Sequence, residues 1–286
     1  MRPLDKHPEL LAINTATLGF QTPIEQAIDA IAKAGFGGIA PWRREVEGKS
    51  VMQIAKRIRD AGLKTVGYCR STYLPAADRA AFLASVENNL RALDDAATLG
   101  AECFVMVVGG LPGNSKSLVS ARAQVLEGSA RLVEHARKLG VRIALEPLHP
   151  MYCADRSCLS TLAQALDMAR AVEPDPPPSG PAIGVLIDAY HLWWDPALGQ
   201  GIIEAGRENR IFGFHVSDWL VPTTDMLNDR GMMGDGVIEL AAIRRQVEAA
   251  GYTGLVEVEI FSAANWWRRP VAEILAVAKE RLQTVC

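Results

Sequence analysis

The sequence predicts a parallel (β/α)8 barrel of the TIM type, and three observations support this fold class. First, eight short apolar runs alternate with eight longer helical patterns along the 286 residues. Second, the apolar runs are rich in β-branched residues, as strands covered on both faces are. Third, no GxGxxG motif follows the first run, which weakens the alternative of a doubly wound sheet. We therefore expect one barrel domain over residues 1–286.

Each predicted element has its own range. The strands are expected at 10–14, 37–40, 63–68, 102–108, 141–146, 182–188, 210–216 and 254–260. The helices are expected at 23–34, 50–61, 78–99, 117–139, 159–172, 199–208, 238–250 and 270–284. Five of these helices precede a glycine, which accepts the left-handed conformation of a helix C-cap at little cost: Gly35, Gly62, Gly100, Gly140 and Gly251. The proline-rich segment 173–181 precedes the sixth strand, so we expect it to stiffen a loop at the N-terminal end of the barrel.

Composition narrows the class of protein. The formal net charge of −3 predicts no binding to nucleic acid or to an anionic membrane surface. Five cysteines form no zinc-type pair, which indicates reduced thiols. The sequence shows no apolar run of the length that a signal peptide or a membrane-spanning helix needs. We therefore expect a soluble cytoplasmic protein.

Four successive predicted strands end on a side chain that can bind a metal ion. The fifth ends in Glu146, the sixth in Asp188, the seventh in His215 and the eighth in Glu259. Strand alternation directs all four side chains to the barrel axis, at the end where barrel enzymes carry their active sites. Three carboxylates that meet in a buried place need a cation. Oxygen ligands with one imidazole favour Mn²⁺, Mg²⁺ or Co²⁺, and Zn²⁺ stays an alternative.

The same alternation makes predictions for neighbouring positions. In the seventh strand, Ile211 and Gly213 should face the axis together with His215. In the eighth strand, Glu257 should also face the axis, one layer below the metal-binding residues. A buried carboxylate needs a partner, and we expect Arg142 to provide it.

The four strand-end residues resemble those of the xylose isomerase-like superfamily of barrels, often called the sugar phosphate isomerase/epimerase family. The resemblance covers nearly the whole chain. It implies that Glu146, Asp188, His215 and Glu259 bind one divalent metal and that Glu146 and Glu259 also transfer protons. It further implies that His191, three residues after Asp188, contacts a substrate oxygen.

The predicted chemistry is proton transfer next to a carbonyl. A metal ion can stabilise the enediolate that forms when a carboxylate removes the proton, and a second carboxylate can return it. This predicts an isomerase or epimerase of a small keto-sugar or its phosphate. The alternatives are a dehydratase or lyase of a cyclic keto-polyol, of the inosose or dehydroshikimate type, and, remotely, a DNA repair nuclease of the endonuclease IV type. The nuclease needs histidines after early strands. The second, third and fourth predicted strands end in "APWRRE", "GYCRS" and "VVGG", which contain no histidine.

Four further residues are candidates for substrate binding. His149 either lines the pocket or caps a turn. Asp218 either orients a ligand and binds a substrate hydroxyl or only begins a loop. Arg230, in the glycine-rich loop 228–240, is a candidate for binding a substrate anion or hydroxyl. Trp219 is one of several tryptophans after strand ends, where aromatic faces suit either sugar C–H groups or an interface between copies in a homo-oligomer.

Overall fold

The computed structural model describes residues 1–20 and 22–286, and its main sheet is an eight-stranded parallel barrel. The neighbour order is β3-β2-β1-β10-β7-β6-β5-β4. The strands are β1 (Leu11–Asn14), β2 (Gly38–Ala40), β3 (Lys64–Thr65), β4 (Cys103–Met106), β5 (Arg142–Leu145), β6 (Ile183–Asp188), β7 (Ile211–Val216) and β10 (Val256–Val258). All eight predicted strands are therefore confirmed, although most are shorter than expected.

The segment after β3 closes the barrel. Tyr68 donates its backbone N–H to the carbonyl of Cys103 at 3.0 Å, and Val105 donates to the carbonyl of Tyr68 at 3.1 Å. Glu102 donates to the carbonyl of Thr65 in the same way. The two end strands of the neighbour order, β3 and β4, thus meet without leaving an open edge.

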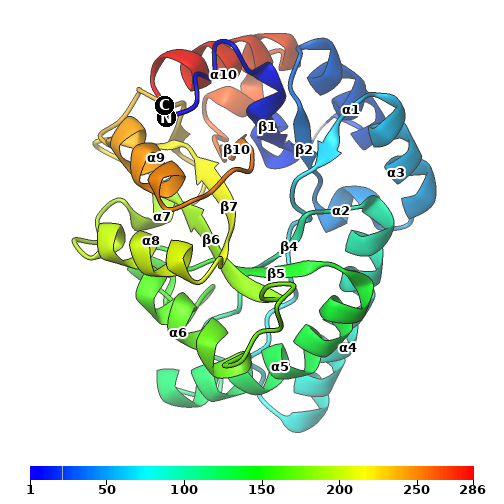
Figure 1. Ribbon diagram of the computed structural model, residues 1–286, viewed down its shortest axis with the longest axis vertical. Coiled ribbons are helices and arrows are strands. Elements are labelled where there is room, and N and C mark those ends of the chain that lie inside the picture. Colours follow the sequence, from blue (N-terminus) through cyan, green and yellow to red (C-terminus); the bar gives the residue numbers. More distant parts are fainter. Residues whose placement is uncertain (21) are drawn as a thin grey trace.

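Helices form a ring around the barrel (Figure 1). The predicted ones are found at α1 (Ile24–Lys33), α3 (Val51–Asp60), α4 (Arg79–Leu99), α5 (Leu118–Leu139), α6 (Leu162–Val172), α8 (Leu198–Arg207), α9 (Leu240–Ala249) and α10 (Val271–Thr284). Two short helices, α2 (Arg43–Val46) and α7 (Ala189–Leu192), follow β2 and β6 and were not predicted. Each long helix buries one face, as α1 does with Ile24, Ala27, Ile28 and Ile31.

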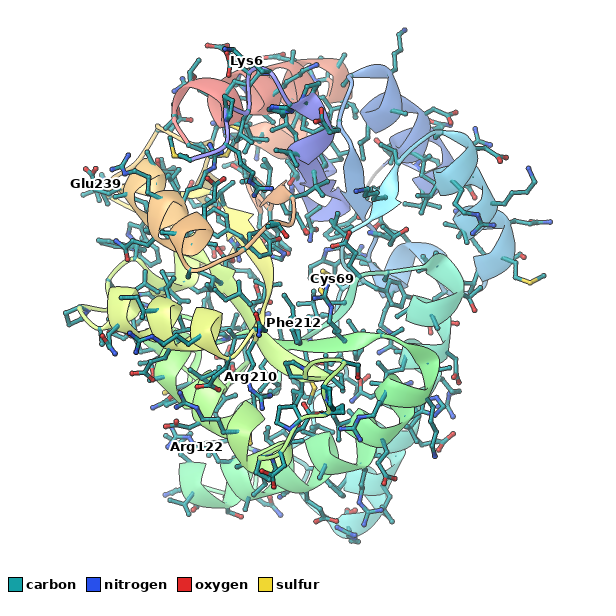
Figure 2. The ribbon with its side chains drawn as sticks, in the orientation of Figure 1. Lys6, Cys69, Arg122, Arg210, Phe212 and Glu239 are labelled. Carbon is teal, nitrogen blue, oxygen red and sulfur yellow. The ribbon has the colours of Figure 1, made fainter. Side chains whose placement is uncertain are left out.

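Apolar side chains divide between the outer core and the barrel axis. The large cluster between strands and helices includes Ile143, Val185 and Val258. A smaller cluster inside the barrel contains Ala144, Leu186 and other side chains of its lower layer. In Figure 2, the labelled side chains of Cys69 and Phe212 lie near the centre of the ring, whereas those of Arg122 and Glu239 lie at its edge.

A bulge in β7 corrects one prediction. Val185 pairs with Ile211, but the next residue, Leu186, pairs with Gly213, so Phe212 is an extra residue in the strand. Phe212 belongs to the cluster inside the barrel, and Ile211 packs in the outer core. The prediction that Ile211 faces the axis is therefore wrong, whereas the bulge leaves His215 on the inner face.

The loop between β7 and α9 contains a small hairpin that was not predicted. Strands β8 (Asp218–Trp219) and β9 (Arg230–Gly231) pair in antiparallel orientation. This hairpin places Arg230 over the C-terminal end of the barrel. Among the described residues, none of the helices combines the length and the apolar character that crossing a membrane requires. All five cysteines lie in the described part of the chain and are unpaired.

Candidate active site

The four strand-end side chains converge at the C-terminal end of the barrel. Glu146, Asp188, His215 and Glu259 each offer a ligand atom, and these atoms all lie within 4.8 Å of one another. The side chains come from four adjacent strands, since β5, β6, β7 and β10 are neighbours in the sheet. All four are buried. The structure thus brings together the complete set that the sequence predicts as a metal site.

His215 lies between three carboxylates. Its Nδ1 atom is 3.6 Å from Oε1 of Glu146 and 3.7 Å from Oε2 of Glu259. Its Nε2 atom points the other way and is 3.1 Å from Oε1 of Glu257. Glu257 therefore pairs with His215. The prediction that Arg142 is its partner is wrong, because Arg142 donates to the backbone carbonyl of Glu102 and stacks its guanidinium on the ring of Phe212.

Glu257 also connects His215 to a side chain that lines the cavity. Asn14 donates from Nδ2 to Oε1 of Glu257 at 2.8 Å. Trp42 donates from Nε1 to Oδ1 of Asn14 at 2.6 Å. The chain from Trp42 through Asn14 and Glu257 to His215 is buried for most of its length, so each member holds the next in a fixed orientation.

Arg230 neutralises part of the carboxylate cluster. Its Nη1 atom is 3.3 Å from Oδ2 of Asp188 and 3.1 Å from Oε2 of Glu259. Its Nη2 atom is 3.1 Å from Nε2 of His191. The guanidinium packs over the ring of Tyr190, with 4.4 Å between the guanidinium carbon and the ring centroid. Arg230 is thus buried in the site rather than solvated.

Burial and charge together shift the protonation of the cluster. Burial raises the pKa of Glu146 to about 7 and raises the pKa of Asp188. Burial would also raise the pKa of Glu259, but His215 and Arg230 hold it below its ordinary value. Burial alone would lower the pKa of His215, yet Glu257 and the other carboxylates raise it well above its usual range. His215 and Arg230 thus offset part of the negative charge of the carboxylates.

The donor set fits a divalent metal ion. Oε1 of Glu146 and Nδ1 of His215 are buried and have no hydrogen-bond partner among the described residues. Metal-to-ligand bonds of about 2.0–2.2 Å place opposite donors about 4 Å apart. The four ligand atoms lie within 4.8 Å of one another, so small rotations of the side chains would bring them to metal-binding distance. A cation would satisfy both of the unpaired atoms and offset the three carboxylates.

A cavity of about 110 Å³ lies beside this cluster. Two predicted metal-binding residues, Glu146 and Glu259, and two predicted substrate-binding residues, His191 and Arg230, contribute to its lining. The other lining residues are Trp42, Cys69, Arg70, Tyr73, Val105, Val107, Leu148, Tyr152, Arg156, Leu227 and Phe261. Sequence reasoning missed most of these side chains. Arg70 and Tyr73 directly follow the third predicted strand, a position that could have indicated them.

Three predicted substrate-binding residues lie outside the cavity lining. His149 caps the turn of Pro150–Tyr152 by accepting the N–H of Met151, which was the structural alternative for this residue. Asp218 accepts backbone hydrogen bonds within its own loop. Trp219 packs on aromatic rings, with 4.9 Å between its ring centroid and that of His149.

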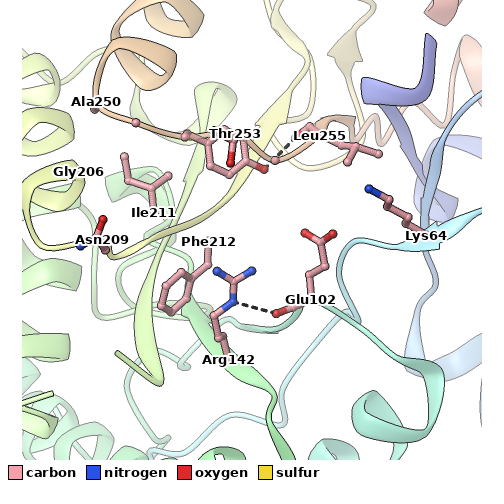
Figure 3. A pocket seen from close by; sticks show the side chains of 13 residues that line it. Lys64, Glu102, Arg142, Gly206, Asn209, Ile211, Phe212, Ala250, Thr253 and Leu255 are labelled. Atoms are coloured by element: carbon pink, nitrogen blue, oxygen red, sulfur yellow. Dashed lines mark hydrogen bonds between the residues drawn. The ribbon is translucent and has the colours of Figure 1, made fainter. Parts of the chain in front are cut away.

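A larger cavity, of about 410 Å³, lies at the opposite end of the barrel (Figure 3). Lys64, Glu102 and Arg142 line it, and each stands at the N-terminal end of its strand. This end carries one carboxylate among the labelled charged side chains and none of the four clustered ligands. The candidate ligands therefore lie beside the smaller cavity, at the C-terminal end.

Comparisons with known proteins agree with this architecture. A family model described as "Xylose isomerase-like TIM barrel" matches residues 28–281. A crystal structure of a protein from Sinorhizobium meliloti 1021 is 49% identical, with a TM-score of 0.93 over 98% of this chain and 99% of that chain.

Two characterised relatives are more distant. An inosose isomerase of Bacillus velezensis is 23% identical over an alignment that covers 96% of this chain and 96% of that protein. A 3-dehydroshikimate dehydratase of Pseudomonas putida is 24% identical over an alignment that covers 86% of this chain. The match covers 37% of the dehydratase, so this chain corresponds to only one part of it.

Proposed function

Since the chain belongs to the xylose isomerase-like TIM barrel family, we propose that it is a divalent-metal-dependent isomerase or epimerase of a small keto-sugar or sugar phosphate. The observation that carries the proposal is the convergence of Glu146, Asp188, His215 and Glu259 beside a cavity. These four residues would hold the metal ion. The ion would polarise the substrate carbonyl and stabilise the negative charge that develops when the adjacent proton leaves. Mn²⁺, Mg²⁺ and Co²⁺ suit the donors best, and Zn²⁺ is an alternative.

The two cavity-lining glutamates have complementary roles in this proposal. Glu146 and Glu259 follow β5 and β10, which are separated in the sheet by β6 and β7, so they approach a bound substrate from different directions. One carboxylate takes the proton from the carbon next to the carbonyl, and the other returns a proton. Return to the neighbouring carbon gives isomerisation, and return to the opposite face of the same carbon gives epimerisation. In this proposal His191 and Arg230, which both line the cavity, bind substrate oxygens.

A second candidate is dehydration of a cyclic keto-polyol. The similarity to a 3-dehydroshikimate dehydratase over 86% of this chain supports it. The same residues suffice, because proton removal next to the carbonyl followed by loss of a β-hydroxyl gives the dehydrated product. The two candidates therefore differ in the fate of the intermediate and share the site.

Conservative substitution tests the proton-transfer roles. Glu146→Gln and Glu259→Gln keep the shape and one oxygen ligand but remove the base. At saturating metal we expect each to lower kcat by at least about 10²-fold. Glu102→Gln, at the opposite end of the barrel, is the matched control and should leave kcat unchanged. Incubation of wild type with its ketose in heavy water should place deuterium next to the carbonyl, and a dehydratase would release one water.

Metal content tests the ligand set separately. We expect one divalent ion per chain after dialysis of the wild type, and a loss of that ion in Asp188→Ala. Equal metal content in both proteins would remove Asp188 from the site. Full activity of both Glu→Gln variants, together with no deuterium in the product, would rule out the proposed mechanism.

A further inference from the structure

Two further arginines line the cavity beside the metal-binding cluster. Arg70 lies just beyond β3, and Arg156 lies in the loop between β5 and α6. Both side chains line the cavity and are only partly exposed. Val105, Val107 and Leu148 line it as well and give the space an apolar part. A molecule in this cavity therefore contacts the carboxylates and Arg230 of the metal-binding cluster. It also contacts Arg70 and Arg156.

Arg70 has guanidinium donors to spare. One Nη1 hydrogen bond goes to the backbone carbonyl of Ser71 at 3.2 Å. The guanidinium also packs over the ring of Tyr73, with 4.6 Å between its carbon and the ring centroid. Among the described residues, no carboxylate lies within ion-pair distance of Arg70, whereas most arginines of this chain have one. Arg70 is thus a cation oriented by an aromatic ring, with its charge unpaired.

Arg156 is oriented in a similar way. Its guanidinium carbon is 5.7 Å from the ring centroid of Tyr152, another cavity-lining residue. Its nearest carboxylate is that of Asp155, 3.6 Å from Nε, and the Asp155 side chain is 64% exposed to solvent. Such an exposed pair is weak. Asp225, further along the rim, uses its carboxylate on the backbone N–H groups of Leu227 and Asn228.

The metal-binding cluster and the pair Arg70 and Arg156 differ in how far their charges are neutralised. At the metal-binding cluster, Arg230 pairs with Asp188 and Glu259, and a bound divalent ion would offset most of the remaining carboxylate charge. Among the described residues, the one ion pair that Arg70 and Arg156 make is the weak, exposed contact between Arg156 and Asp155. An anionic group of a ligand would neutralise these arginines, and the planar guanidinium matches a carboxylate or a phosphate.

We propose that the substrate is a keto-polyol that carries a carboxylate or phosphate group remote from its carbonyl, and that Arg70 and Arg156 bind this group. The inference rests on the proposed function, because it takes the metal cluster as the position of the reacting carbons. It selects an anionic substrate over a neutral sugar. The apolar side chains that line the cavity would face the carbon skeleton.

Paired substrates test the proposal. The metal-loaded protein is assayed with 3-dehydroshikimate against neutral inosose, and with fructose 6-phosphate against fructose. We expect one anionic member to be turned over with a kcat/KM at least about 10-fold above its neutral counterpart, the scale of one charge-assisted hydrogen bond. The first pair reports on a carboxylate and the second on a phosphate.

Substitution tests whether Arg70 and Arg156 bind the anionic group of the substrate. Arg70→Gln and Arg156→Gln should each raise KM for the anionic substrate by about 10- to 100-fold with a small effect on kcat, and should leave the neutral counterpart unchanged. Arg70→Lys keeps the charge without the planar fork and should be intermediate. Arg91→Gln is the matched control, because Arg91 lies on the exposed face of α4 and pairs with Glu87.

Two outcomes would overturn the proposal while leaving the proposed function intact. One is a neutral member turned over as well as its anionic counterpart. The other is an unchanged KM in both Arg→Gln variants that fold as wild type by circular dichroism. If no compound is turned over, calorimetric titration decides, and no binding of 3-dehydroshikimate or fructose 6-phosphate counts against the proposal. Failure of the wild type to bind any divalent metal would instead contradict the proposed function.

Discussion

At the scale of single residues, His215 shows how the barrel prepares a metal ligand. Its Nδ1 atom faces Glu146 and Glu259, and its Nε2 atom is 3.1 Å from Glu257. A carboxylate behind a histidine fixes the ring orientation and makes the other nitrogen a better ligand. Asn14 holds Glu257 in turn. Glu257 therefore acts through His215 and is a positioning residue.

Substitution of Glu257 should weaken metal binding. Glu257→Val removes the carboxylate that lies 3.1 Å from Nε2 of His215, and we expect the dissociation constant for Mn²⁺ to rise by about 10- to 100-fold. Glu257→Gln keeps an oxygen acceptor without the charge and should have a smaller effect. Calorimetric titration of the metal-free proteins measures both constants. Equal affinities in wild type and Glu257→Val would show that the contact with Glu257 does not strengthen metal binding by His215.

At the scale of elements, the loop between β7 and α9 is organised by Asp218. Its Oδ1 atom accepts the N–H groups of Trp219 at 2.9 Å and Ile238 at 3.0 Å, and its Oδ2 atom accepts that of Gly234 at 2.8 Å. A Cβ atom on Gly236 would lie 2.2 Å from the carbonyl oxygen of Trp219, so the loop must carry glycine there. This tight loop holds β9 and with it Arg230.

Loss of Asp218 should therefore affect both stability and activity. Asp218→Ala leaves three backbone N–H groups without their acceptor, and we expect a loss of about 2 kcal/mol or more in the free energy of unfolding. We also expect kcat to fall, because Arg230 loses its support. Asp235→Ala, in the same loop but half-exposed, is the control and should change either quantity little. Urea unfolding and steady-state kinetics make the comparison, and a wild-type kcat in a folded Asp218→Ala would contradict this role.

The sequence predicts strand ends better than loops. Alternation of apolar residues locates Glu146, Asp188 and Glu259, because a barrel strand has a fixed inner face. The same rule fails at Ile211, since the bulge at Phe212 shifts the pattern by one residue. Alternation makes no prediction for His149 and Asp218, which lie in loops. Their side chains accept hydrogen bonds from backbone N–H groups whose positions are fixed only in the folded loop. Arg70 and Arg156 lie beyond strand ends, where sequence spacing no longer fixes direction.

At the scale of the whole molecule, the two ends of the barrel differ in the side chains that they carry. The C-terminal end gathers the four candidate ligands and a small cavity, whereas the N-terminal end has a larger cavity without such a cluster. The net charge of the chain is −3, and several basic residues on the helices are paired with acidic ones. A net negative charge disfavours binding to a nucleic-acid backbone.

The overall charge predicts that the protein does not act on DNA. We expect no cleavage of a duplex with an abasic site, with added Zn²⁺ or Mn²⁺, and no binding that weakens with salt. Electrophoresis of a labelled duplex and a salt titration of its binding measure both. Efficient incision would move the protein to the nuclease branch of the family.

The central claim is that one divalent ion binds among four strand-end residues at the C-terminal end of the barrel. Diffraction from crystals grown with Mn²⁺, recorded near the manganese absorption edge, tests it directly. The account predicts a single strong anomalous peak per chain, bonded to Glu146, Asp188, His215 and Glu259. A peak at any other position, or no peak at a Mn²⁺ concentration that saturates activity, would contradict it.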